Sequence, residues 1–184
     1  MADPLIERAL VLTHVKQPGM SDFCHILNQY GVEIFSTGEI FKNLKEARVE
    51  VSPLFKFTGT PFPPDEALEI LHPSIISGLS LNKDKEKQRK HINQNGIRLL
   101  DLLVCNFESP IGDIEVAKIA LLGVAARNRR VTVATGEQAL NSILDEMHKN
   151  GEQAIVSEAM RSSLANEALT LIAEYCLAAA KLSV

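Results

Sequence analysis

Apolar and polar positions along the chain fall into blocks that predict short strands separated by helices. Five short apolar runs read as strands, and they lie at residues 8–13, 32–35, 48–51, 99–105 and 131–135. Run 99–105 is apolar at nearly every position, which is typical of a parallel strand buried on both faces. Strands that alternate with helices predict an α/β fold: a three-layer, doubly wound, mainly parallel sheet of about five strands.

The segments between the runs carry the spacing of amphipathic helices. Phe23, Ile26, Leu27 and Tyr30 follow the i, i+3, i+4, i+7 pattern of a helix that buries one face. A second apolar stripe over residues 168–179 predicts that the chain ends in an amphipathic helix. We therefore expect a single domain over residues 1–184, with residues 151–184 as a C-terminal helical extension packed on it.

Two stretches interrupt this alternation. Four prolines in residues 53–64 predict an irregular loop, because proline lacks a backbone donor. Residues 83–98 are rich in lysine and arginine, with two acids among them. No aromatic side chains interleave with these bases, so the stretch is interpreted as a solvated helix face rather than a nucleic-acid surface.

Composition narrows the function classes. The chain has 184 residues, 46% of them apolar and 23% charged, which is typical of a soluble globular protein. A net charge of −4 argues against a nucleic-acid partner, and no apolar run is long enough for a membrane span. Three cysteines without a C-x-x-C pair predict reduced thiols in a cytoplasmic protein. The sequence has no Walker A or dinucleotide-binding glycine motif and no metal-ligand spacing, so we expect no cofactor and no metal.

Candidate chemistry lies where the predicted strands end, because doubly wound sheets bind ligands at the carboxyl ends of their strands. The turn Ser36-Thr37-Gly38 opens a helix, and helix N-termini suit phosphate groups. An ordinary helix N-cap is the alternative. Lys16 is a candidate counter-ion for phosphate, with a solvated lysine as the alternative. The candidates for binding substrate or phosphate are His14, Lys16, Ser36, Thr37, Gly38 and Asn106.

Several segments resemble one known family in the order in which they occur. They are RALVLTHVKQPG, GVEIFSTGEI, VSPLFKFTGTP, LLDLLVCNFES and IEVAKIALLGVAARN. Together they resemble the IMP cyclohydrolase domain of the bifunctional purine biosynthesis enzyme. This resemblance implies a methylglyoxal-synthase-like fold. It also implies closure of the purine ring of a formamido-imidazole carboxamide ribonucleotide, with loss of water, to give IMP.

The resemblance also implies where the chemistry would lie. Acid/base groups and oxyanion stabilisers would surround a nucleotide or a related phosphometabolite, and turns at the strand ends would hold its phosphate. The implied catalytic positions are Glu69, Glu108, Glu115, Arg127 and His72. The C-terminal stripe could pack on its own sheet or on a second subunit, so a homodimer is possible.

Four of these positions depart from the family pattern. The family has Lys, Tyr, Asp and Lys where this chain has Glu69, Glu108, Glu115 and Arg127. The exchange makes this set acidic, and an acidic site disfavours a phosphate dianion. Three hypotheses stay open: an IMP-cyclohydrolase-type enzyme, a non-catalytic phosphometabolite-binding or regulatory module of the same fold, and a metal site built from the three glutamates with a histidine.

Overall fold

A parallel sheet forms the centre of the computed structural model, which describes residues 3–13, 17–60, 66–107, 113–151 and 153–182. Its five strands are β1 (Arg8–Leu12), β2 (Glu33–Ser36), β3 (Val51–Pro53), β4 (Leu102–Cys105) and β5 (Thr132–Ala134). They lie in the order β3-β2-β1-β4-β5, and every neighbouring pair is parallel. This arrangement confirms the predicted α/β fold class with its five-stranded sheet.

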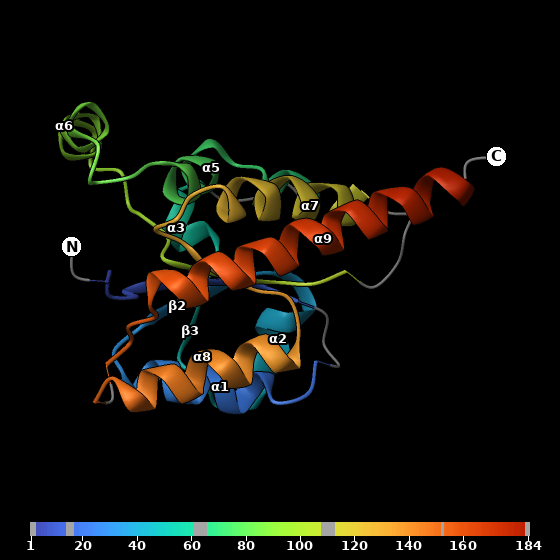
Figure 1. Cartoon of the computed structure of the whole chain (residues 1–184), viewed down its shortest axis with the longest axis horizontal. Coiled ribbons are helices and arrows are strands. Elements are labelled where there is room, and N and C mark those ends of the chain that lie inside the picture. Colours follow the sequence, from blue (N-terminus) through green and yellow to red (C-terminus); the bar gives the residue numbers. More distant parts are fainter. Residues whose placement is uncertain (1–2, 14–16, 61–65, 108–112, 152, 183–184) are drawn as a thin grey trace.

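Helices cover both faces of the sheet (Figure 1). One face carries α1 (Met20–Gln29), α2 (Gly38–Glu46) and α8 (Glu137–Lys149). The other carries α5 (Pro73–Ser80), α7 (Asp113–Ala126) and the 25-residue C-terminal helix α9 (Glu158–Leu182). The central strands β1 and β4 are buried from both sides, which explains why their sequences are apolar at nearly every position.

The C-terminal helix is longer than its apolar stripe predicted. Its first half packs on α7 and β5, and Leu164 and Ala168 are buried there. The segment before α9 also meets the beginning of the chain, because the backbone N–H of Ile6 donates to the Ala154 carbonyl at 2.7 Å. Among the described residues, no helix has the length and apolar character needed to cross a membrane.

Several element boundaries differ from the sequence prediction, and β4 begins at Leu102 rather than at residue 99. The third strand begins at Val51 rather than at residue 48, because Arg48 takes a left-handed conformation (φ 62°) just after α2 and turns the chain. The proline-rich loop contains the one-turn helix α3 (Phe55–Thr58), while its residues 61–65 lie outside the described ranges. It leads to the short helix α4 (Glu66–Ile70).

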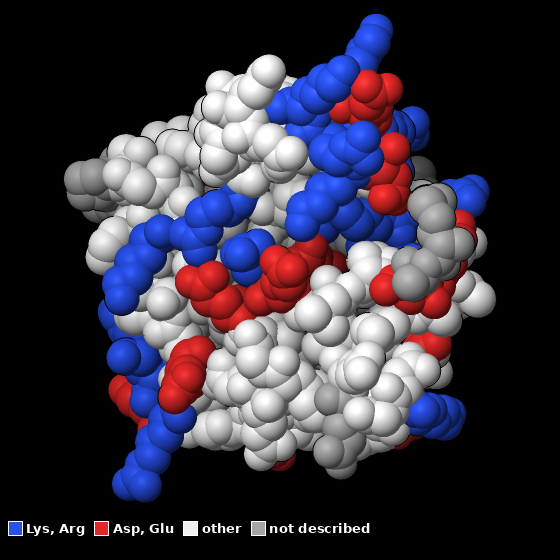
Figure 2. Space-filling model, turned by 90° about the vertical axis from the view of Figure 1, so that its left-hand side faces the viewer, with Lys and Arg blue, Asp and Glu red and all other residues white. Residues whose placement is uncertain are grey.

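The basic stretch forms α6 (Glu86–Asn95), in which Ile92 is the buried residue. The remaining side chains of this helix are largely exposed, as expected for a solvated face. The face of the molecule at the left of Figure 1 is drawn in Figure 2, where basic side chains lie beside acidic ones.

A buried ion pair holds the amino ends of the strands together. Asp101 accepts from the backbone N–H groups of Glu7 (3.1 Å) and Arg8 (3.0 Å) and pairs with Arg130. Arg130 also donates to the carbonyls of Gly78 (2.9 Å) and Leu100 (2.8 Å). Burial raises the pKa of Asp101, and the charge of Arg130 opposes that shift.

Candidate functional site

The strand order reverses between β1 and β4, and ligands of doubly wound folds bind at the carboxyl ends of such strands. Thr13 follows β1 and Asn106 follows β4. The Thr13 hydroxyl donates to Asn106 Oδ1 at 2.7 Å, and the Asn106 amide donates to Gln17 Oε1. Asn106 therefore lies at the switch point, as the sequence predicted, and links the ends of the two central strands.

The predicted phosphate turn lies at the end of the neighbouring strand β2. Ser36 is fully buried and donates to the Val11 carbonyl at 2.8 Å, so its hydroxyl ties β2 to β1. Gly38 has φ 62°, a conformation that glycine adopts without strain. Thr37 is the N-cap residue of α2, but its side chain makes no capping hydrogen bond and donates instead to the Glu69 carboxylate.

Glu69 of α4 reaches this turn, and His72 follows three residues later at the start of α5. Glu69 is 8% exposed, so α4 brings a buried carboxylate to the turn that ends β2. His72 is the N-cap of α5, where its Nδ1 accepts from the Ser74 N–H at 3.2 Å. Its Nε2 lies 3.4 Å from the Thr60 hydroxyl. The structure thus gives His72 a capping function at this position.

Glu115 lies near the start of α7, and its carboxylate is paired. Lys118 Nζ lies 3.0 Å from Glu115 Oε1, and the two side chains are 10% and 7% exposed. The sequence analysis included the charge of Glu115 in the candidate site but did not pair it with Lys118. Their i, i+3 spacing is the usual signal for an ion pair within a helix. The pair changes the charge balance of this edge, because a lysine neutralises one of the two described glutamates.

Further groups surround the end of β4. Cys105 contacts the Lys118 carbonyl oxygen through its sulfur at 4.0 Å, and burial raises the pKa of the Cys105 thiol to about 12. A thiol with that pKa is protonated at neutral pH and does not act as a nucleophile. Tyr175 of α9 packs on Phe107 with ring centroids 4.9 Å apart. Desolvation and the nearby Glu115 carboxylate raise the pKa of Tyr175.

Arg127 is not brought together with these groups within one chain. It is exposed and follows the end of α7, twelve residues beyond Glu115. A helical rise of about 1.5 Å per residue separates the two backbones by about 18 Å. The neighbouring Asn128 donates to the Leu79 carbonyl at 2.7 Å, at the opposite edge of the sheet. His14, Lys16 and Glu108 lie outside the described residues.

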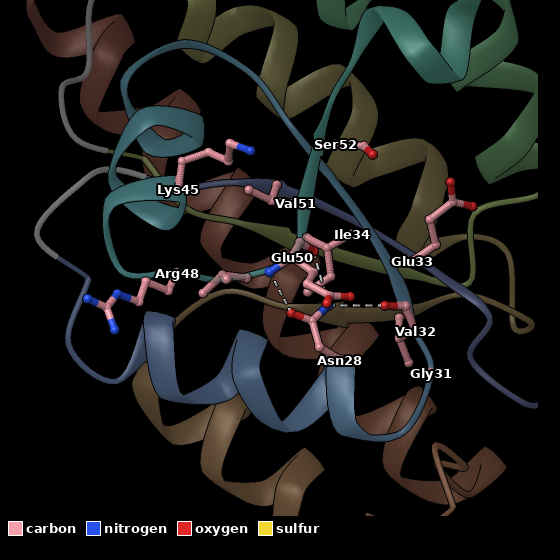
Figure 3. A pocket seen from close by; sticks show the side chains of 11 residues that line it. Asn28, Gly31, Val32, Glu33, Ile34, Lys45, Arg48, Glu50, Val51 and Ser52 are labelled. Carbon is pink, nitrogen blue, oxygen red and sulfur yellow. Dashed lines mark hydrogen bonds between the residues drawn. The ribbon is translucent and has the colours of Figure 1, made fainter.

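A separate cavity has a volume of about 560 Å³ (Figure 3). It is bounded by the ends of α1 and α2 and by the residues that lead into β2 and β3. Asn28 occupies it with hydrogen bonds to the backbone of Glu50, at 2.9 Å and 3.1 Å. Of the predicted site residues that the structure describes, none lines this cavity. Among the described residues, no group of three or more His, Cys, Asp or Glu could hold a metal ion.

Comparison with known proteins identifies relatives of this chain. No family model matches. The bifunctional purine biosynthesis protein PurH of Chlorobaculum parvum is 34% identical over 190 residues, which covers 95% of this chain and 36% of the relative. PurH of Clostridium botulinum is 29% identical over 185 residues, with 93% and 36% covered. The chain thus spans about a third of the length of these relatives, and the match confirms the resemblance seen in its motifs.

A solved structure supports the fold independently of close sequence similarity. The crystal structure of ForH superposes with a TM-score of 0.84 and covers 97% of this chain and 100% of its own. At 21% identity, this likeness concerns the arrangement of the strands and helices alone.

Proposed function

We propose that this relative of PurH is an IMP-cyclohydrolase-like protein of purine nucleotide biosynthesis. Its ligand would be the formamido-imidazole carboxamide ribonucleotide, bound at the carboxyl ends of β1, β2 and β4. The observation that carries the proposal is the 34% identity over 95% of the chain. The gathering of Asn106, Thr37 and Glu69 where such folds bind ligands supports it.

The reaction requires groups that this edge can supply. The carboxamide nitrogen attacks the formyl carbon and loses a proton, while the formyl oxygen gains one and finally leaves as water. Such a proton shift is catalysed by a proton acceptor near the nitrogen and a hydrogen-bond donor near the oxygen. Glu69 and Glu115 are carboxylates on this side of the sheet, and we assign the acceptor function to this pair of residues.

A second candidate function is a phosphometabolite-binding or regulatory module without catalysis. Two observations favour it. The resemblance implies Lys, Tyr, Asp and Lys at the positions where this chain has Glu69, Glu108, Glu115 and Arg127. Arg127 also lies beyond the far end of α7, where it cannot act on the same ligand as Glu115 within one chain. In this function the site would hold the nucleotide but would not close its ring.

A single assay with two readouts separates these functions. The purified protein is incubated with the formamido nucleotide, IMP formation is followed by absorbance, and the melting temperature is recorded with and without IMP. IMP formed above the uncatalysed rate supports the enzyme. A shift in melting temperature without turnover supports the binding module. Absence of both effects contradicts both functions.

The variant Glu69→Gln tests the position of the site. It keeps the size of the side chain and a partner for Thr37, so the fold should persist while ring closure falls by at least about 100-fold. Glu86→Gln on the exposed helix α6 is the matched control and should leave the rate unchanged. Equal rates for Glu69→Gln and the wild type would place the chemistry elsewhere.

A further inference from the structure

The Glu115–Lys118 pair is a buried ion pair near the start of α7. Lysine is almost never buried unless it is paired, and desolvating both charges costs more than an isolated pair usually returns. Replacing such a pair by apolar side chains often leaves stability unchanged or higher. An ion pair that adds little to stability, placed beside a candidate site, therefore suggests a chemical function.

The position of Lys118 supports this reading. Its backbone carbonyl contacts the sulfur of Cys105, the last residue of β4. The next residue along the chain is Asn106, which is tied to Thr13 at the end of β1. The second turn of α7 therefore packs against the switch point, where the carboxyl ends of the two central strands meet. The ammonium and carboxylate of the pair belong to this edge of the sheet.

Ring closure needs a proton donor and a proton acceptor, and an ammonium paired with a carboxylate supplies both. The carboxamide nitrogen forms a bond to the formyl carbon, and the π electrons of the carbonyl move to the oxygen. The oxygen takes a proton from an ammonium group and the nitrogen gives one to a carboxylate. In the second step the lone pair of the formamido nitrogen forms a C=N bond to the former formyl carbon as the C–O bond breaks, and the hydroxyl leaves as water with another proton from the ammonium. The formamido nitrogen then loses its proton to the carboxylate.

An ion pair can supply both steps, because the proton returns from carboxylic acid to amine across the contact after each one. In Lys118 and Glu115 that contact measures 3.0 Å, which is the length of a direct hydrogen bond. The pair ends each step in its starting state, and the net reaction is the nucleotide converted to IMP and water.

Resting on the proposed function, we propose that Lys118 is the proton donor to the formyl oxygen, held in position by Glu115. This assignment gives the site an ammonium group on α7, near its first turn, in place of Arg127 at the far end of the same helix. Lys118 lies three residues from Glu115, the nearest position that the family motif marks as catalytic, so its assignment comes from the structure.

The test compares three variants with the wild type. Lys118→Met removes the donor, and Lys118→Arg keeps the charge but lacks a transferable proton near neutral pH. The double variant Glu115→Gln with Lys118→Met removes both charges, so it leaves no unpaired buried charge that could prevent folding. Lys90→Met, from the exposed pair on α6, is the control for the loss of a lysine. Ring closure, the Kd of IMP and the melting temperature are measured for each.

We expect Lys118→Met, Lys118→Arg and the double variant to close the ring at least about 100-fold more slowly than the wild type. Lys118→Arg should bind IMP with a Kd within about threefold of the wild-type value, because it preserves the charge and hydrogen-bonding capacity. A folded double variant with wild-type turnover would show that the pair is structural. That result would overturn the assignment of Lys118 but not the proposed function. A wild type without turnover would overturn the enzymatic function and this assignment together.

Discussion

At the scale of single residues, Gly78 is required by close packing. A Cβ atom at this position of α5 would lie 3.0 Å from the Arg98 carbonyl oxygen and 3.4 Å from the side chains of Leu100 and Phe57. The Gly78 carbonyl also accepts from Arg130, which limits how far the backbone can move. We expect Gly78→Ala to lower the free energy of unfolding by about 1–3 kcal/mol through overpacking.

Gly123→Ala in α7 is the matched control. Its added Cβ would meet only Ile172 Cδ1, at an ordinary 3.9 Å. Because glycine in a helix interior costs about 0.5–1 kcal/mol relative to alanine, this variant should be more stable than the wild type. Urea unfolding followed by circular dichroism measures the free energy of unfolding of both variants. Equal effects of the two substitutions would mean that contact with Arg98 does not limit position 78.

The residue scale also shows what the sequence could and could not predict about the site. Ser36, Thr37 and Asn106 were placed correctly at the strand ends, because parallel strands deliver the residues that follow them to one edge. Lys118 was missed because the family pattern drew attention to Glu115 alone. The direction of the Thr37 hydroxyl, toward Glu69 and away from the helix end, depends on the tertiary position of α4. No local pattern contains that information.

At the scale of elements, the Asp101–Arg130 pair joins the segments that precede β1, β4 and β5 with the end of α5. Both side chains are buried, so removal of the carboxylate leaves an uncompensated guanidinium. We expect Asp101→Asn to lower the free energy of unfolding by about 3–5 kcal/mol. Guanidinium titration measures the loss. Glu86→Gln, which breaks the exposed Glu86–Lys90 pair, should cost less than about 1 kcal/mol. Similar losses in both variants would contradict a special contribution of the buried pair.

Element lengths explain the other differences between sequence and structure. The apolar pattern located all five strands, but the third begins three residues late because the backbone turn at Arg48 has no apolar signature. Arg127 lies far from Glu115 because α7 is continuous over 14 residues. The two ends of this helix therefore lie at opposite edges of the sheet. The helical rise alone gives this separation, because α7 runs from Asp113 to Ala126 without a break.

At the scale of the whole molecule, buried charged side chains lie at both edges of the sheet. At the amino edge, Arg130 and Arg161 pair with Asp101 and Asp3 and also donate to backbone carbonyls, which ties separate segments together. At the carboxyl edge, where the proposed function places the ligand, Glu69 accepts from Thr37 and Lys118 pairs with Glu115. Variants at the first edge should therefore change stability, and variants at the second should change ligand affinity or rate.

Arg161 tests whether residues at the amino edge act on stability alone, because its side chain joins three separate segments there. It donates to Asp3 Oδ1 at 3.0 Å, to the Arg129 carbonyl at 2.8 Å and to the Val156 carbonyl. These bonds join the N-terminal segment and the turn before β5 to the start of α9. Arg161→Ala should lower the free energy of unfolding by about 1.5–3 kcal/mol, since hydrogen bonds to a charged group are lost.

The neighbouring Arg129 is the control, because its side chain is 81% exposed and its pair with Glu158 lies at the surface. Arg129→Ala should cost less than about 1 kcal/mol. Hydrogen exchange followed by mass spectrometry should show faster exchange of residues 3–7 and 158–168 in Arg161→Ala, with β2 unchanged. IMP affinity should stay at the wild-type value in both variants. A loss of affinity in Arg161→Ala at a temperature where it is fully folded would show that the two edges are coupled, because a purely stabilising residue acts on the folded fraction alone.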